Sequence, residues 1–119
     1  MSHSPQDVHK KLLGKKGEKL AERYLRGLGY RLLAKNYRTP FGEADLIFSV
    51  GDETVFVEVK TRSSFAYGEA REAVNYEKQA RYRKIALYYG QQTGEELNAR
   101  FDVVEVYESG EIEHYLSAF

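Results

Sequence analysis

The sequence predicts an α/β fold: one domain with a central mixed β-sheet flanked by helices. Five strand-like runs and two helical patterns follow one another in the order αβββαββ. The step from the third run through the second helix to the fourth run suits a parallel crossover, which makes the sheet mixed. The length of 119 residues suits one hydrophobic core and is short for two.

The first helix is predicted over about residues 9–28, where apolar residues recur at helical spacing and Gly29 follows as a C-cap. The residues of this stripe are Leu20, Ala21, Tyr24, Leu25 and Leu28. Residues 1–7 are polar, so we expect a flexible tail ahead of the helix. We therefore divide the chain into residues 1–13, the tail and the start of the helix, and residues 14–119, the folded domain.

Five strands and a second helix account for most of the remaining chain, separated by polar or glycine-containing connections. The expected strands are 30–34, 44–50, 53–60, 101–107 and 112–116, and the expected helix is 71–89, ended by Gly90. On this helix a polar stripe consists of Arg71, Asn75, Gln79 and Arg83. The apolar stripe consists of Val74, Tyr82, Ile85 and Tyr89, and Lys78 interrupts it.

The hairpin of the second and third strands is expected to bring two carboxylates together. Gly51-Asp52 fits a two-residue type II′ turn, because glycine stands in its first central position. In that register Asp45 opposes Glu58, and opposed side chains lie on one face with Cβ atoms roughly 4.5–5.5 Å apart. Lys60 shares this face two residues further along the strand. Two carboxylates this close repel, and one binds a proton unless a cation lies between them.

A solvated strand face is the alternative explanation of this acid pair. Ile47 and Phe56 share the face and need cover, however, which favours a cleft at one end of a covered sheet. Two opposed acids suit Mg²⁺, which usually takes one or two carboxylates, keeps several waters and meets a substrate phosphate. Such a metal polarises a phosphoryl oxygen and lowers the pKa of a bound water. The Lys60 ammonium could hold that water or neutralise charge on the phosphate.

Glu18 interrupts the apolar stripe of the first helix. Continuing from Leu28, Leu25 and Ala21 back by three residues reaches Glu18, where an apolar side chain is expected. From the spacing alone, a salt bridge or a carboxylate directed to solvent explains this position better than catalysis.

The charges are unevenly distributed, although 18 basic and 18 acidic side chains give a formal net charge of zero. Residues 1–38 hold ten Lys and Arg against three acids, whereas residues 101–119 hold five acids and no Lys or Arg. A basic surface of this kind commonly meets phosphates, and a solvated basic helix face is the alternative.

Composition excludes several other classes of protein. The chain has no cysteine, which excludes a disulfide framework, a thiolate zinc site and a cysteine nucleophile. Its first residues lack the apolar segment of a signal peptide, and its longest apolar run, 85–89, is far too short to cross a membrane. We therefore expect a cytoplasmic protein with no membrane partner.

Asp45, followed on the next strand by Glu58-Val59-Lys60, resembles the core motif of the PD-(D/E)XK nucleases, and the element order is similar. The closer resemblance is to the bacterial YraN-like family, whose members are thought to be endonucleases related to archaeal Holliday junction resolvases. It covers about residues 14–119. The matching segments are Gly17-Glu18, Gly29-Tyr30, Asn36-Tyr37-Arg38, Gly42 to Ile47, Phe56 to Arg62, Ala73-Val74, Lys78-Gln79, Arg100 to Val104 and Ala118-Phe119.

The resemblance implies a restriction-endonuclease-like fold, with residues 14–119 as a nuclease-like domain. It implies a catalytic set that consists of Glu18, Asp45, Glu58 and Lys60, with Asp45 and Glu58 binding the metal and Gln79 as an accessory residue. Ala44 stands where a proline precedes the first acid in the superfamily, a departure that removes no ligand. Because archaeal resolvases act as dimers on four-way junctions, a homodimer and branched DNA are further expectations.

The leading hypothesis is therefore an endonuclease that hydrolyses phosphodiester bonds in DNA, including branched DNA, with Mg²⁺ as cofactor and Mn²⁺ as a substitute. The basic side chains assigned to DNA are Lys15, Lys16, Lys19, Arg38 and Arg62. One alternative is a DNA-binding or assembly module that keeps the nuclease fold without turnover. Another is a purely structural role, in which the acid pair shares a proton or is bridged by Lys60.

Overall fold

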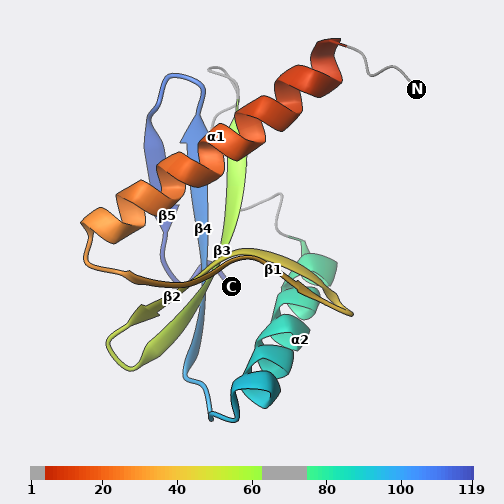
Figure 1. Ribbon diagram of the computed structural model, residues 1–119, viewed down its shortest axis with the longest axis vertical. Helices are drawn as coiled ribbons and strands as arrows, with labels where there is room; N and C mark the ends of the chain where they lie inside the picture. The colour runs from red at the N-terminus through yellow and green to blue at the C-terminus, as the bar shows by residue number, and fades with distance from the viewer. Residues whose placement is uncertain (1–4, 63–74) are drawn as a thin grey trace.

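A five-stranded mixed sheet forms the centre of the protein, with one helix on each face (Figure 1). In this computed structural model the backbone is described for residues 5–62 and 75–119, and side chains are described from residue 14 onward within those ranges. The helices are α1 (Pro5–Gly27) and α2 (Tyr76–Thr93). The strands are β1 (Arg31–Thr39), β2 (Gly42–Val50), β3 (Glu53–Arg62), β4 (Ala99–Tyr107) and β5 (Ile112–Tyr115). The predicted fold class and the αβββαββ order are confirmed.

β3 is the central strand of the sheet, whose order is β1-β2-β3-β4-β5. It forms an antiparallel pair with β2 and a parallel pair with β4. The parallel pair runs from Thr54–Ala99 to Arg62–Tyr107. The outer pairs, β1 with β2 and β4 with β5, are antiparallel. The parallel pair is the one predicted from the strand–helix–strand step, and it makes the sheet mixed.

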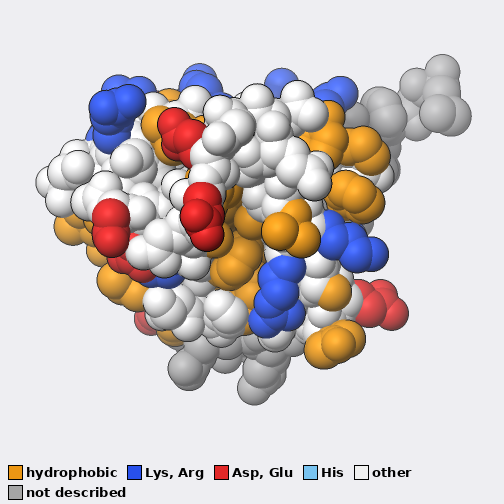
Figure 2. Space-filling view, turned by 90° about the horizontal axis from the view of Figure 1, so that it is seen from below, with side chains coloured by type: hydrophobic (Ala, Val, Ile, Leu, Met, Phe, Trp, Pro, Cys, Tyr) orange, Lys and Arg blue, Asp and Glu red, His pale blue; other side chains and the backbone are white. Residues whose placement is uncertain are grey.

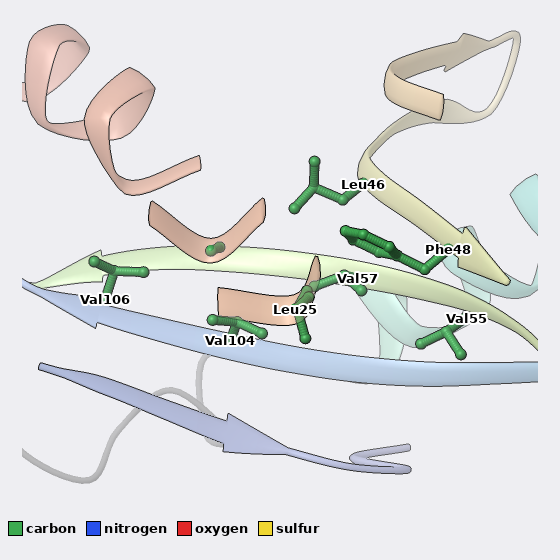
Figure 3. Close-up of a cluster of buried hydrophobic side chains, with 8 residues drawn as sticks. Leu25, Leu46, Phe48, Val55, Val57, Val104 and Val106 are labelled. Carbon is green, nitrogen blue, oxygen red and sulfur yellow. The ribbon is translucent and has the colours of Figure 1, made fainter. Parts of the chain in front are cut away.

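Apolar side chains form a separate core cluster under each helix. Ala21 and Leu25 of α1 pack on the strand residues of Figure 3: Leu46, Phe48, Val55, Val57, Val104 and Val106. Under α2 the buried cluster consists of Ala44, Ile47, Phe56, Tyr82, Ile85 and Ala86. Because both faces are covered, β2 and β3 have uninterrupted buried runs, 46–48 and 55–58, rather than alternating burial.

α1 packs closely on β3 at Gly17, which is buried. A Cβ atom added to Gly17 would lie 2.2 Å from Cγ2 of Thr61, so a larger residue requires something to move. Thr61 directly follows Lys60 on β3. The contact therefore fixes the next residue of α1, Glu18, at the end of β3 that carries Lys60.

The predicted hairpin register is confirmed by the pairs Val50–Glu53, Ser49–Thr54 and Ile47–Phe56. Gly51 has a φ of 59°, as the first central position of a type II′ turn requires. The ladder ends at Leu46–Val57, one pair before Asp45 and Glu58. Beyond that point Oδ2 of Asp45 accepts a hydrogen bond from the N–H of Val59 at 2.8 Å. The two acids thus lie where β2 and β3 separate, rather than as a regular cross-strand pair.

The end of α1 was predicted correctly, whereas its start was not. Gly29 has a φ of 93°, and the N–H of Tyr30 donates to the carbonyl of Leu25 at 3.1 Å, as in a Schellman C-cap. Leu28, included in the predicted apolar stripe, follows the helix and is 51% exposed. The helix begins at Pro5 rather than near residue 9, since proline is favourable in a first helical turn.

Two further element ends differ from the prediction by more than two residues, those of β1 and α2. β1 continues to Thr39 rather than ending at residue 34, because it pairs with β2 throughout, with a bulge between Leu32 and Ala34. α2 passes through Gly90 and ends at Gly94, which has a φ of 72° and donates its N–H to the Gly90 carbonyl. Gly90 is tolerated inside the helix because the returning chain packs closely over it. The predicted helix start at residues 71–74 lies outside the described residues.

Candidate functional site

Three of the predicted catalytic residues come together where β2 and β3 separate. Glu58 and Lys60 occupy alternate positions on β3, so both side chains lie on the sheet face that α2 covers. Nζ of Lys60 lies 3.4 Å from Oε1 of Glu58. Asp45 enters from β2, with its carboxylate fixed by the N–H of Val59, which stands between Glu58 and Lys60. The geometry therefore brings one acid from β2 together with an acid and a lysine from β3.

Glu58 is almost fully buried, and α2 supplies two of its partners. The hydroxyl of Tyr82 donates to Oε2 at 2.5 Å, and Nζ of Lys78 forms an ion pair with Oε1. Burial raises the pKa of Glu58, but the hydrogen bonds from Lys78 and Tyr82 and the charges of Lys78 and Lys60 outweigh it, so that the pKa lies below its usual value. Glu58 is consequently a charged, well-ordered acceptor at neutral pH.

Asp45 is the acid of the pair that is less well neutralised. Burial raises the pKa of Asp45 to about 7, and the negative charges of Glu58 and Glu18 act in the same direction. The hydrogen bond from Val59 and the charge of Lys78 only partly oppose these effects. This is the expected behaviour of crowded acids that lack sufficient positive charge.

The pKa of Lys60 lies below its usual value. Burial is the main cause, and the neighbouring Lys78 adds to it, while the negative charge of Glu58 opposes both. Its side chain is 25% exposed, so the ammonium is within reach of solvent.

Glu18, on α1, lies close enough to Asp45 for its charge to act on that acid. Its Oε1 accepts a hydrogen bond from Nδ2 of Asn36 at 2.8 Å. Asn36 stands in β1 between the residues that pair with Leu46 and Ala44, and therefore beside Asp45. Its φ of 48° places it in the left-handed region, which asparagine tolerates better than most residues. The effect of Glu18 on the pKa of Asp45 is consistent with this placement.

Basic side chains surround this part of α1. Lys15, Lys16 and Lys19 are exposed, and two of them line a hollow of about 190 Å³ beside Glu18 and Asn36. This hollow is lined by Lys15, Glu18, Lys19, Glu22, Lys35, Asn36 and Leu46. The structure thus adds Lys35, which sequence analysis did not select, although Nζ of Lys35 also lies 3.3 Å from Glu22.

The two predicted basic residues outside α1 have different surroundings. Arg38 is 86% exposed, with its Nε 3.6 Å from Glu43, two residues before Asp45 in β2. Arg62 is only 21% exposed, and its Nε lies 3.6 Å from the fully buried Glu105 of β4. Arg38 is therefore open to a partner, whereas Arg62 is directed into the sheet face.

Lys78 and Tyr82 are the functional candidates that sequence analysis missed. They are one helical turn apart on α2, so both side chains reach Glu58. The interruption of an apolar stripe by Lys78 was the available signal, because a buried lysine needs an anion. Gln79, the predicted accessory residue, follows Lys78 on the same helix and is half-buried. The helical residue with an ion pair to Glu58 is its neighbour, Lys78.

Asp45 and Glu58 are the residues that fit a divalent cation. No three acidic or histidine side chains converge into a metal-binding group among the residues that the structure describes. Two carboxylates are, however, the number that Mg²⁺ usually takes, with waters completing its shell. The raised pKa of Asp45 marks a need for positive charge at this position. The donor chemistry therefore suits Mg²⁺ rather than a cation that needs a full protein cage.

A larger hollow of about 760 Å³ lies elsewhere, where α2 ends and the chain returns to β4. Its lining includes Leu87, Leu97 and Phe101 but none of the candidate site residues. Figure 2 shows this end of the molecule, where hydrophobic side chains are open among charged ones. Because catalysis needs polar groups that converge, we place the candidate site at the acid pair and not in this apolar hollow. Neither described helix has the length and hydropathy needed to span a membrane.

One compact α/β domain, with a five-stranded mixed sheet and two helices, is consistent with a restriction-endonuclease-like fold. The chain belongs to the uncharacterised protein family UPF0102, whose model matches residues 17–106. A UPF0102 protein of Thermodesulfovibrio yellowstonii is 48% identical over 107 residues, covering 90% of this chain and 95% of the relative. One of Caldanaerobacter subterraneus is 42% identical over 119 residues, covering 94% and 98%. The structure of Pyrococcus furiosus SfsA in complex with Ca²⁺ matches with a TM-score of 0.34 and 18% identity, covering 90% of this chain and 63% of SfsA.

Proposed function

We propose that this protein is a metal-dependent endonuclease of the PD-(D/E)XK superfamily that hydrolyses phosphodiester bonds in DNA. The observation that carries the proposal is the convergence of Asp45, Glu58 and Lys60 where β2 and β3 separate. Mg²⁺ is the proposed cofactor and Mn²⁺ its substitute, held by the carboxylates of Asp45 and Glu58. When bound, the metal polarises a phosphoryl oxygen and lowers the pKa of a bound water.

The remaining side chains of the site have roles that follow from their positions. Lys60 holds or transfers a proton at its Nζ, which is favoured by its lowered pKa. Tyr82 donates to Oε2 of Glu58 and so fixes the orientation of that carboxylate. Glu18, held by Asn36, contributes negative charge beside Asp45 and strengthens the preference of the site for a cation.

The proposed substrate is DNA, including branched DNA, and the proposed assembly is a homodimer. The exposed lysines of α1 support a polyanionic partner, because Lys15 and Lys19 line the hollow beside Glu18. A phosphodiester backbone that followed these lysines would pass next to Glu18 and Asn36, and Asn36 stands opposite Asp45 in the β1–β2 pair. The preference for branched DNA and the dimer rest on the resemblance to archaeal resolvases.

Cleavage assays on linear, nicked and four-way DNA with Mg²⁺ or Mn²⁺ test the proposal. We expect the wild type to cut at least one of these substrates and Asp45→Asn and Glu58→Gln to be inactive. Lys60→Met should lower the cleavage rate by roughly 10²- to 10⁴-fold, the usual contribution of a proton-transferring side chain.

Asp52→Asn is the matched control, because Asp52 is an exposed acid in the β2–β3 turn. It should leave the cleavage rate unchanged. A pure, folded wild type that cuts none of these substrates with either metal would refute the proposal. Activity that survived Asp45→Asn and Glu58→Gln would instead indicate a contaminating nuclease.

A non-catalytic DNA-binding or assembly module is the second candidate, and one observation favours it. Two lysines already neutralise Glu58 in this structure, Lys78 by direct ion pairing and Lys60 at 3.4 Å. Such a module would bind DNA equally well with and without Mg²⁺, and Asp45→Asn would not change its affinity. The binding assay should therefore be run beside the cleavage assay, with and without metal.

A further inference from the structure

The side chain of Lys78 lies at the position where the proposed metal needs Glu58. Its Nζ forms an ion pair with Oε1 of Glu58, closer than the Nζ of Lys60 on the same oxygen. The Tyr82 hydroxyl donates a hydrogen bond to the other oxygen, Oε2. Both carboxylate oxygens of Glu58 therefore have protein partners, and one of these partners carries a full positive charge.

An ammonium group and a divalent cation cannot both lie against one carboxylate oxygen without strong repulsion. The repulsion is larger here than at an open surface, because Glu58 is 7% exposed and the side chain of Lys78 only 17% exposed. Both lysines have flexible four-carbon side chains, but the Nζ of Lys78 lies closer to Oε1 of Glu58 than that of Lys60, at 3.4 Å. The repulsion from a metal at this oxygen therefore falls mainly on Lys78, which is the lysine that must withdraw.

We propose that Lys78 is the counter-ion of Glu58 in the metal-free protein. The metal must displace Lys78, and the displaced Lys78 then binds a phosphodiester oxygen of DNA. This inference rests on the metal site of the proposed function. It adds a coupling between the binding of the metal and the binding of DNA. A displaced Lys78 needs another anion, because Lys60 remains nearby as a like charge. DNA phosphate satisfies this need, so metal and DNA bind more tightly together than either binds alone.

Titration of the metal-free protein with Mn²⁺ in a calorimeter, without DNA, tests the displacement. Lys78→Met keeps most of the aliphatic side chain and removes the charge, and Lys78→Gln also keeps a hydrogen-bond donor for Glu58. We expect both variants to bind Mn²⁺ more tightly than the wild type, by roughly 5- to 150-fold, the usual range of a coupling between two ligands. Lys84→Met, an exposed lysine on the same helix, controls for the change in net charge and should match the wild type.

The second half of the proposal is tested with a short DNA duplex and Ca²⁺ as the metal. Ca²⁺ should raise the DNA affinity of the wild type and of Lys84→Met, and should raise that of the two Lys78 variants much less. Thermal melting of each variant shows that it is folded. Because Lys60 and Tyr82 still contact Glu58 in both Lys78 variants, we expect cooperative melting.

The outcomes separate this inference from the proposed function. Equal or weaker Mn²⁺ binding by both Lys78 variants overturns the inference, even when the wild type cleaves DNA. Tighter Mn²⁺ binding by the variants supports displacement, even when the wild type cleaves nothing and the nuclease proposal fails. An increase in DNA affinity with Ca²⁺ that is the same in all four proteins overturns the role of Lys78 toward phosphate.

Discussion

Asp102 illustrates how a single buried charge is stabilised away from the candidate site. It is fully buried on β4 and accepts hydrogen bonds from both Nε and Nη2 of Arg100, each at 2.9 Å. Nε2 of His114 lies 2.7 Å from Oδ2, and the N–H of Ser117 donates to Oδ1 at 3.0 Å. Burial by itself raises the pKa of Asp102, but these partners together hold it below its usual value. The network joins β4 to β5 and to the end of the chain.

Asp102→Asn should lower the free energy of unfolding by about 1–3 kcal/mol near pH 7, because Arg100 loses its bidentate partner but keeps the ion pair with Glu53 at 3.1 Å. The folded pKa of Asp102 lies below the unfolded value of about 3.9, so the unfolded chain binds the proton first as the pH falls. The stabilisation is therefore complete above about pH 4 and is lost as the pH falls through the folded pKa. Urea unfolding at several pH values measures this.

The difference between wild type and Asp102→Asn should accordingly shrink at acid pH. Asp52→Asn, in the exposed hairpin turn, should change neither the stability nor its pH dependence appreciably. If the difference in the free energy of unfolding between wild type and Asp102→Asn stayed constant to the lowest pH measured, Asp102 would not be held as a carboxylate by its partners.

At the scale of elements, the packing of α1 on β3 depends on one small residue. Gly17 has no room for a Cβ because Cγ2 of Thr61 lies in its place, whereas a Cβ on Gly14 of the same helix would meet nothing within 4 Å. Alanine substitutions at these two glycines therefore distinguish the effect of packing on stability from the effect of helix propensity. The packing at Gly17 also sets the position of Glu18 next to it.

Gly17→Ala should destabilise the protein by about 1–3 kcal/mol through overpacking, reduced by the better helix propensity of alanine. Gly14→Ala has only the second effect and should raise stability by up to about 1 kcal/mol. Combining Gly17→Ala with Thr61→Ser removes the obstructing methyl group and should restore much of the stability. Thermal or urea unfolding of the four proteins checks this, and a stabilising Gly17→Ala would contradict the close packing.

The β2–β3 hairpin could be predicted from the sequence, whereas the contacts of α2 with it could not. A two-residue turn and alternating side chains fix the register locally, and so Asp45 and Glu58 were correctly expected at one place. The ion pair of Lys78 with Glu58 depends on how the crossover returns α2 to the sheet, which no local pattern specifies. The separation of β2 and β3 at Asp45 could not be predicted either. There the N–H of Val59 donates to the side-chain carboxylate of Asp45 instead of to a backbone carbonyl, and no local pattern indicates this.

At the scale of the whole molecule, the uneven charge of the sequence becomes a surface with distinct parts. Lys15, Lys16 and Lys19 are exposed on α1, while exposed acids lie at the β4–β5 turn and on β5: Glu108, Glu111 and Glu113. Zero net charge therefore coexists with a basic helix surface. Local charge and not the total governs the approach of a polyanion.

If duplex DNA binds along α1, its affinity should fall steeply with salt. Each Lys→Gln substitution at these three positions should reduce the slope of log affinity against log salt concentration by about 0.9 for every phosphate that the lysine neutralises in the wild type. Lys84→Gln, on α2, should leave the slope unchanged. Fluorescence anisotropy at several salt concentrations measures the slopes, and equal slopes in all variants would exclude α1 as the DNA-binding surface.

The irregular backbone of β1 also protects the free edge of the sheet. Among the described strands β1 has a neighbour on one side only, and such a strand can act as a template for pairing with another chain. The bulge near Leu33 and the left-handed Asn36 interrupt its repeating pattern of donors and acceptors, and Arg31, Lys35 and Arg38 place positive charge along it. A second molecule could not add a long, regular strand there. The same Asn36 that holds Glu18 beside the acid pair thus makes aggregation through this edge unfavourable.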